Sequence, residues 1–141
     1  RLSRGLGDVY KRQILKKGKK IAFLNLGTRL KKVLEINEMI KNHHKLNCTV
    51  VDMRFAKPID TKLIQNLNKT HDIFITIEEN AIGGFSSQVN DFLINKLNKT
   101  PKILNFFMKD EFIDQSDIDD QYNKSGISKE LIFDKISTLL K

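Results

Sequence analysis

The sequence has 141 residues, of which 40% are hydrophobic and 30% charged, so it is long enough for one domain with a buried core. No apolar run approaches the roughly 20 residues that a membrane-spanning helix needs, and the single cysteine, Cys48, excludes a disulfide within the chain and fits a reducing cytoplasm. The net charge of +8 suggests a nucleic-acid partner, but apart from the cluster Lys16–Lys20 the lysines are scattered without interleaved aromatic residues, so we expect none.

The first 13 residues, RLSRGLGDVYKRQ, differ in character from the remainder. They contain two glycines, show no clear periodicity and lack the frequent Lys, Asn and Ile of the later sequence. They also carry a net charge of +3, which leaves +5 for the rest of the chain. We interpret residues 1–13 as a linker or a non-native segment, and we place the domain at residues 14–141.

Strand and helix patterns alternate through the domain. Short apolar runs predict buried strands at Ile21–Leu26, Cys48–Asp52, Ile73–Ile77 and Ile103–Met108. Helical periodicity predicts helices that begin near Leu30, near Pro58 and Asp60, near Ser86, and at Ser128. This order predicts an α/β fold with three layers, in which helices cover both faces of a mainly parallel sheet of about five strands.

Arg54 is the candidate ligand-binding residue of the domain. In open α/β sheets, ligands bind to the loops that leave the carboxyl ends of the strands, and Arg54 directly follows the predicted strand Cys48–Asp52. Its guanidinium could bind a phosphate or a carboxylate through two parallel hydrogen bonds. Alternatively, it could be a structural residue that pairs with Asp52 or Glu78, and position alone does not choose between the two roles.

A second candidate region follows the strand Ile73–Ile77. Gly83 and Gly84 precede a helix, but the complete glycine-rich phosphate-binding motifs are missing, so we expect these glycines to allow a close approach of backbone. Glu78 and Glu79 are consecutive and face opposite sides of a continued strand, which argues against an acid and base pair in one pocket. We therefore predict that Glu78, Glu79, Gly83 and Gly84 contribute to a domain or dimer interface.

Other reactive side chains do not form recognisable sites. His43, His44 and His71 have no second ligand at a metal-binding spacing, so we expect no metal site. Cys48 lies in a strand pattern without a nearby cation that would lower its pKa, which indicates a small buried hydrophobic residue and not a nucleophile. We accordingly expect no catalytic residue in this chain.

Four runs of the sequence carry a family resemblance. They are LNLGT, VVDMRFAKPIDTKLI, HDIFITIEENAIGGFSSQVNDFL and FIDQ with the later SGISKELI. Together they resemble the C-terminal domain of the 1-deoxy-D-xylulose-5-phosphate synthases, within the transketolase family, over residues 14–141. The patterns R-F-x-K-P-[IL]-D and E-E-N-A-I-x-G-G are the most specific. Phe106–Ile113 departs from the family, because FFMKDEFI stands where a G-[LI]-P-D-x-F-I run is usual.

The resemblance implies a fragment of a cytoplasmic, homodimeric transferase that uses thiamine diphosphate and Mg²⁺. Such an enzyme joins pyruvate to glyceraldehyde 3-phosphate with loss of CO₂, and its product feeds isoprenoid, thiamine and pyridoxal synthesis. The cofactor would bind to preceding domains through a G-D-G motif that is absent here, so the fragment alone would be inactive, and Arg54 would hold the substrate phosphate. Two alternatives stay open: another transketolase relative or 2-oxo acid dehydrogenase β subunit, and a free-standing anion-binding module.

Overall fold

The computed structural model describes residues 14–26, 30–53, 59–78, 84–107 and 128–141 of the chain. At its centre is a five-stranded sheet with the strand order β1-β3-β2-β4-β5. Strands β2 to β5 run parallel, whereas β1 pairs antiparallel with β3. The strands are β1 (Ile14–Lys16), β2 (Lys20–Leu26), β3 (Thr49–Asp52), β4 (His71–Glu78) and β5 (Lys102–Phe107).

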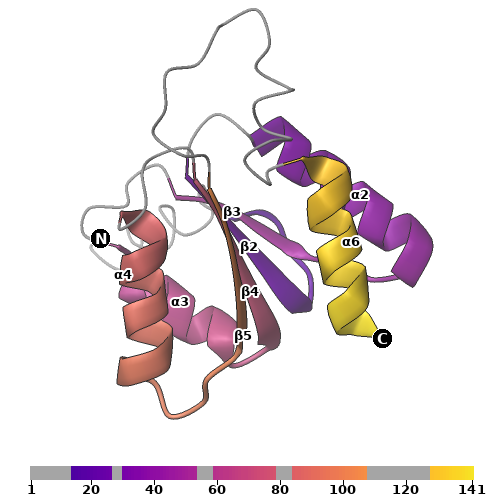
Figure 1. Cartoon of the computed structure of the whole chain (residues 1–141). Helices are drawn as coiled ribbons and strands as arrows, with labels where there is room; N and C mark the ends of the chain where they lie inside the picture. Colours follow the sequence, from indigo (N-terminus) through magenta and orange to yellow (C-terminus); the bar gives the residue numbers. More distant parts are fainter. Residues whose placement is uncertain (1–13, 27–29, 54–58, 79–83, 108–127) are drawn as a thin grey trace, which may run out of the picture.

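Helices cover both faces of the sheet (Figure 1). On one face lie α2 (Leu30–His44) and α6 (Lys129–Leu140), and on the other lie α3 (Thr61–Asn68) and α4 (Phe85–Asp91), which continues into the short π-helical segment η1 (Phe92–Lys96). This arrangement confirms the predicted three-layer α/β fold with a mainly parallel sheet. None of the described helices combines the length and the apolar character needed to cross a membrane.

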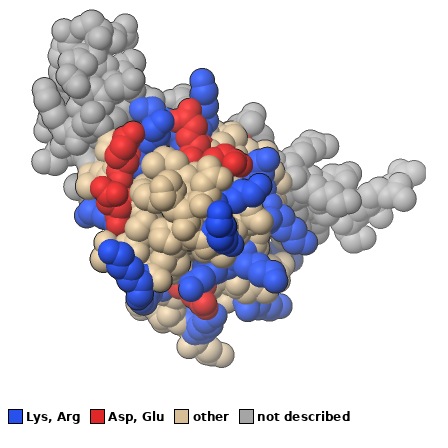
Figure 2. Space-filling model, turned by 90° about the vertical axis from the view of Figure 1, so that its right-hand side faces the viewer, with Lys and Arg blue, Asp and Glu red and all other residues tan. Residues whose placement is uncertain are grey.

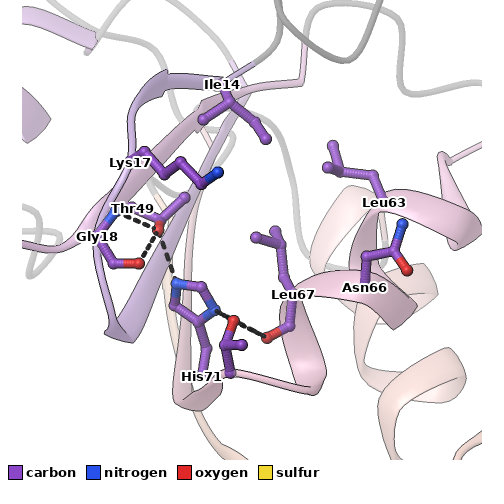
Figure 3. A pocket seen from close by; sticks show the side chains of 9 residues that line it. Ile14, Lys17, Gly18, Thr49, Leu63, Asn66, Leu67 and His71 are labelled. Carbon is purple, nitrogen blue, oxygen red and sulfur yellow. Dashed lines mark hydrogen bonds between the residues drawn. The ribbon is translucent and has the colours of Figure 1, made fainter. Parts of the chain in front are cut away.

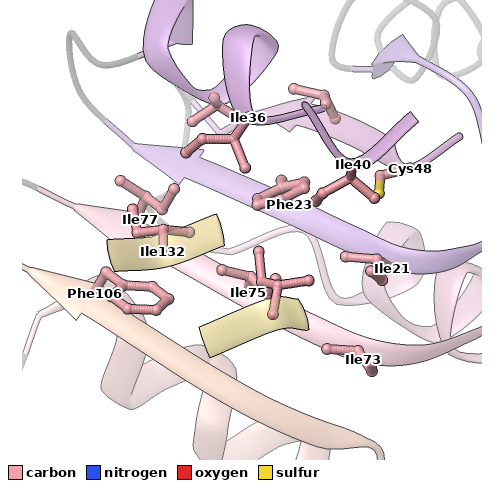
Figure 4. Packing of buried hydrophobic residues seen from close by; sticks show 13 residues of the cluster. Ile21, Phe23, Ile36, Ile40, Cys48, Ile73, Ile75, Ile77, Phe106 and Ile132 are labelled. Atoms are coloured by element: carbon pink, nitrogen blue, oxygen red, sulfur yellow. The ribbon is translucent and has the colours of Figure 1, made fainter. Parts of the chain in front are cut away.

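The sheet is buried on both faces, which explains the nearly continuous apolar runs of its central strands. Along β2, the side chains of Ile21 and Phe23 pack beneath α2 and α6. Figure 4 shows Phe23 beside Ile36 and Ile40 of α2, with Ile132 of α6 over the neighbouring strand β4. Removing such a side chain from water contributes about 1.5–3 kcal/mol to folding, so this layer is a main source of stability.

The opposite face has a second core beneath α3 and α4. Leu24 and Phe74 of the sheet are fully buried there, together with Leu63 of α3 and Val89 of α4. The eight residues of α3 present Leu63, Ile64 and Leu67 inward at helical spacing, as the sequence predicts. Both faces of the sheet are therefore held by separate apolar layers.

Several element boundaries differ from the sequence prediction. Strand β1 was not predicted, because its three residues are too few to show the alternation of apolar and polar side chains that indicates a strand. Strand β3 begins at Thr49, one residue after Cys48. The third helix begins at Phe85, and its second half widens into η1. The predicted start of the last helix is confirmed, because the Leu131 amide donates to Ser128 Oγ at 3.1 Å.

Candidate functional site

The carboxyl ends of the parallel strands form the edge where the sequence predicts a ligand site. Asn25 of β2 pairs in register with Asp52 of β3, and Leu26 pairs with Glu78 of β4. The Met53 amide donates to the Asn25 carbonyl at 2.8 Å, and Met53 is only 1% exposed. The chain thus follows the sheet up to the residue before Arg54. Arg54 itself lies outside the described residues.

Glu78, the last residue of β4, holds the start of α4. Its side chain is fully buried. One carboxylate oxygen accepts from the Phe85 amide at 2.9 Å, and the other accepts from the Ser86 hydroxyl at 2.8 Å and the Ser86 amide at 3.4 Å. The N-cap residue of α4, Gly84, has no side chain to satisfy these amides. Glu78 therefore caps the helix from across segment 79–83, and its negative charge complements the helix dipole.

A carboxylate also occupies the start of α3. Asp60 Oδ1 accepts from the Leu63 amide at 3.0 Å, which confirms Asp60 as the predicted helix-start residue. At the start of α3 the Leu63 amide, and at the start of α4 the amides of Phe85 and Ser86, are thus already bound by carboxylates of the chain itself. A phosphate at either helix would lose these donors and meet a negative charge, so an anion beside α3 or α4 requires a cationic side chain.

The structure locates only some of the predicted site residues. Arg54, Glu79 and Gly83 fall outside the described part of the chain. Glu78 lies inside the domain, where its oxygens already hold three donors, so it is a poor partner for an arginine; pairing with Asp52 stays open. Gly84 has φ −86°, a value that does not require glycine. The interface role of these positions therefore stays a prediction.

His71 and Cys48 lie at the opposite, amino end of the strands. His71 Nε2 is 2.6 Å from Thr49 Oγ1, and Nδ1 is 2.8 Å from the Leu67 carbonyl, which can only accept a hydrogen bond. Burial lowers the pKa of His71, and it raises the pKa of Cys48 to about 12. Cys48 is thus the buried, unreactive thiol that the sequence predicts, and His71 ties β4 to β3.

A cleft of about 240 Å³ lies beside His71 (Figure 3). Thr49 joins His71 to the β1–β2 turn, because the Gly18 amide donates to Thr49 Oγ1 at 2.9 Å. Both ring nitrogens of His71 are therefore occupied by internal partners. The polar groups left for a ligand are those of Lys17 and Asn66, which are too few to define one.

Metal-binding side chains do not gather in the described ranges. No group of three or more His, Cys, Asp or Glu residues there could hold a metal ion. A diphosphate cofactor with Mg²⁺ requires several oxygen ligands around the ion. The described residues do not provide such a set, so we derive no chemical step through a cofactor in this chain.

Comparisons with known proteins agree with this architecture. Residues 11–132 match the model of the transketolase C-terminal domain. A 1-deoxy-D-xylulose-5-phosphate synthase of Haemophilus influenzae is 40% identical over 126 residues, which are 89% of this chain and 19% of that protein. The same enzyme of Psychromonas ingrahamii is 40% identical over 128 residues, 86% of this chain and 20% of that protein.

A solved structure shares the fold. It is described as a split-gene transketolase in an inactive β4 tetramer, and it superimposes with a TM-score of 0.76 at 27% sequence identity. The match covers 89% of this chain and 40% of that one. The chain spans about one fifth of the length of the curated relatives named above. Since the family model covers most of the sequence and the fold agrees, this chain belongs to the transketolase C-terminal domain family.

Proposed function

We propose that this chain is the C-terminal domain of a 1-deoxy-D-xylulose-5-phosphate synthase. In the parent enzyme, pyruvate and glyceraldehyde 3-phosphate would be converted to CO₂ and 1-deoxy-D-xylulose 5-phosphate. The latter product is a precursor for isoprenoids, thiamine and pyridoxal. The relatives at 36–40% identity over most of the chain carry that enzyme name. The two specific patterns around Arg54 and Glu78 support the same assignment.

Arg54 is the residue of this domain that holds the phosphate of glyceraldehyde 3-phosphate. The observation that carries this proposal is the occupation of the α3 and α4 starts by Asp60 and Glu78. Because these carboxylates bind amides at the starts of α3 and α4, a phosphate beside either of these two helices would meet a negative charge. The guanidinium of Arg54, the residue that follows Met53 in the sequence, supplies the missing positive charge and can donate two parallel hydrogen bonds to a phosphate.

The remainder of the parent supplies the cofactor site. Thiamine diphosphate, with Mg²⁺, provides the carbanion chemistry of the reaction when it is bound there. The isolated chain would then be inactive, and the parent would be a cytoplasmic homodimer with Glu79, Gly83 and Gly84 near a domain or subunit contact. The description of a related split-gene chain as an inactive tetramer supports the lack of activity in the separate domain.

Kinetics of the full-length parent test the role of Arg54. Loss of a charged hydrogen-bond pair costs about 2–4 kcal/mol, so Arg54→Ala should raise the KM for glyceraldehyde 3-phosphate about 30-fold to 900-fold. The KM for pyruvate should stay unchanged. Lys62→Ala is the matched control, because Lys62 is an exposed cation near the start of α3.

Three outcomes would contradict the proposal. An unchanged KM for glyceraldehyde 3-phosphate in Arg54→Ala would remove the arginine from the site. A parent that forms no 1-deoxy-D-xylulose 5-phosphate, or a gene in which no cofactor domain is fused before residue 14, would favour a 2-oxo acid dehydrogenase β subunit or a free-standing anion-binding module.

A further inference from the structure

Lysines that are distant in the sequence gather at the amino ends of the parallel strands. We call residues 16–20, 45–48, 68–72 and 99–102, which are loops together with the strand and helix ends that flank them, the lysine edge. Each loop leads into a strand of the sheet, and the edge is the lower end of the sheet in Figure 1. Its eight lysines are all exposed; they are Lys16, Lys17, Lys19, Lys20, Lys45, Lys69, Lys99 and Lys102.

Hydrogen bonds join these loops into one continuous surface. The Lys19 amide donates to the Asn47 carbonyl at 2.9 Å, and the Lys20 amide donates to the Thr70 carbonyl at 3.3 Å. The side-chain amide of Asn68 donates to the Lys99 carbonyl at 2.9 Å. The cationic side chains thus project from a framework whose loops are fixed relative to one another.

The lysine edge carries the whole net charge of the described residues. The only carboxylate side chain within these loops is that of Asp72, and it already pairs with Lys99 at 3.1 Å. The other eight described lysines are balanced by eight described carboxylates. On the face shown in Figure 2, most of the Asp and Glu side chains lie in the upper part, where Lys side chains stand beside them, whereas the charged side chains of the lower part are nearly all Lys. A general richness in lysine would not separate the charges in this way.

The usual structural explanations cover only part of this charge. The carbonyl ends of α2 and α3 lie at this edge, and Lys45 Nζ donates to the Asn42 carbonyl at 3.2 Å, as expected for a cation at a helix end. The lysines of the β1–β2 turn follow no helix. The edge also cannot guide substrate to Arg54, because a strand of eight residues separates the two ends by about 25 Å, well beyond the Debye length of about 8 Å.

We propose that the lysine edge binds the phosphodiester backbone of a structured nucleic acid. The loops lie along five strands spaced about 4.8 Å apart, which gives a row of ammonium groups about 20 Å long that fits a rod-shaped polyanion. No Phe, Tyr or Trp occurs in these loops, so the edge favours duplex phosphates over stacked single-stranded bases.

An anionic membrane fits the edge less well. Peripheral membrane binding by a folded surface normally combines cations with inserted apolar side chains. The large hydrophobic residues that are exposed in the described ranges are Leu15 and Ile94, and neither lies in the loops of the lysine edge. The proposal reverses the expectation from sequence that no nucleic acid is bound, because only the folded sheet brings these lysines together.

The test is fluorescence anisotropy of the 141-residue chain with a labelled RNA duplex of about 20 base pairs, at about 50 mM and about 200 mM KCl. If about four phosphates are contacted, affinity should fall about 100-fold between these salt concentrations. The variant Lys17→Gln, Lys19→Gln, Lys102→Gln should bind at least about tenfold more weakly at low salt. The control variant Lys31→Gln, Lys62→Gln, Lys135→Gln removes equal charge from exposed sites elsewhere and should bind within about twofold of the unchanged chain.

Three results would overturn the proposal. The first is no binding of the duplex at low salt by chain that circular dichroism shows to be folded. The second is equal weakening in both triple variants, because net charge alone would then explain binding. The third is binding to phosphatidylglycerol-containing vesicles without binding to RNA, which would assign the edge to a membrane surface.

Discussion

The cap that Glu78 provides to α4 makes a quantitative prediction for Glu78→Gln. Glutamine keeps the size of the side chain but replaces one acceptor oxygen with an amide group that faces a backbone or hydroxyl donor. Hydrogen bonds to a charged group contribute about 1.5–3 kcal/mol, and a charge at a helix start contributes about 0.3–1 kcal/mol. Since one of the oxygens is lost in a fully buried site, we expect a destabilisation of about 2–4 kcal/mol.

Urea denaturation followed by circular dichroism measures this effect. With a slope of about 2 kcal/mol per molar urea, the midpoint should fall by about 1–2 M while the slope stays unchanged. Asp60→Asn is the matched control: Asp60 caps α3 at a half-buried site, and asparagine caps a helix as well as aspartate, so less than about 0.5 kcal/mol should be lost. Equal, small losses in both variants would refute the assignment of Glu78 as a buried charged cap.

Three further predictions concern the amino end of the sheet. Because burial lowers the pKa of His71, the folded state binds fewer protons than the unfolded state near and below pH 6.5. The contribution of neutral His71 to stability should therefore be fully present above about pH 6.5 and decline below it. His71→Gln should show a smaller fall in Tm on acidification than the unchanged chain, and an equal fall in both would contradict this. With a pKa of about 12, the Cys48 thiol should react with Ellman's reagent at neutral pH only after unfolding, and rapid labelling of folded protein would disprove its burial. Gly18→Ala should cost at least about 3 kcal/mol in urea denaturation, since an added Cβ would lie 2.0 Å from the Asn47 carbonyl oxygen; a neutral effect would show that the turn can move.

The sequence predicts the central layers of this fold well, because their signals are local. The apolar runs predict buried strands at Ile21–Leu26 and Ile73–Ile77, and both lie in internal strands of the sheet. Asp60 and Ser128 mark helix starts through a capping interaction that spans only three residues. Apolar periodicity and capping are encoded within a few positions, so they can be found without the folded structure.

The features that the sequence misses depend on contacts between distant segments. From the sequence, Glu78 was predicted to be an interface residue, because its partners Phe85 and Ser86 are separated from it by segment 79–83. The one signal for a capping role was that Gly84, before the helix, has no side chain that could cap it. His71 read as an isolated histidine, but its partner Thr49 comes from another strand 22 residues away. Such roles become visible only when the register of the strands is known.

The direction of the helices gives the two ends of the sheet opposite chemical character. In a parallel α/β unit, helices start at the carboxyl edge and end at the amino edge, so helix dipoles favour carboxylates at the first and cations at the second. Asp60 and Glu78 follow this rule and bind amides at the starts of α3 and α4, which favours a cationic side chain such as Arg54 for anion binding beside these two helices. At the other edge, eight lysines exceed what the ends of α2 and α3 require, and one of them, Lys20, has a positive φ of 70° at the start of β2, where no helix ends. The same dipole argument therefore accounts for Asp60 and Glu78 at one edge but for the lysines of the other only in part, and the unexplained surplus is the physical reason to seek a polyanionic partner there.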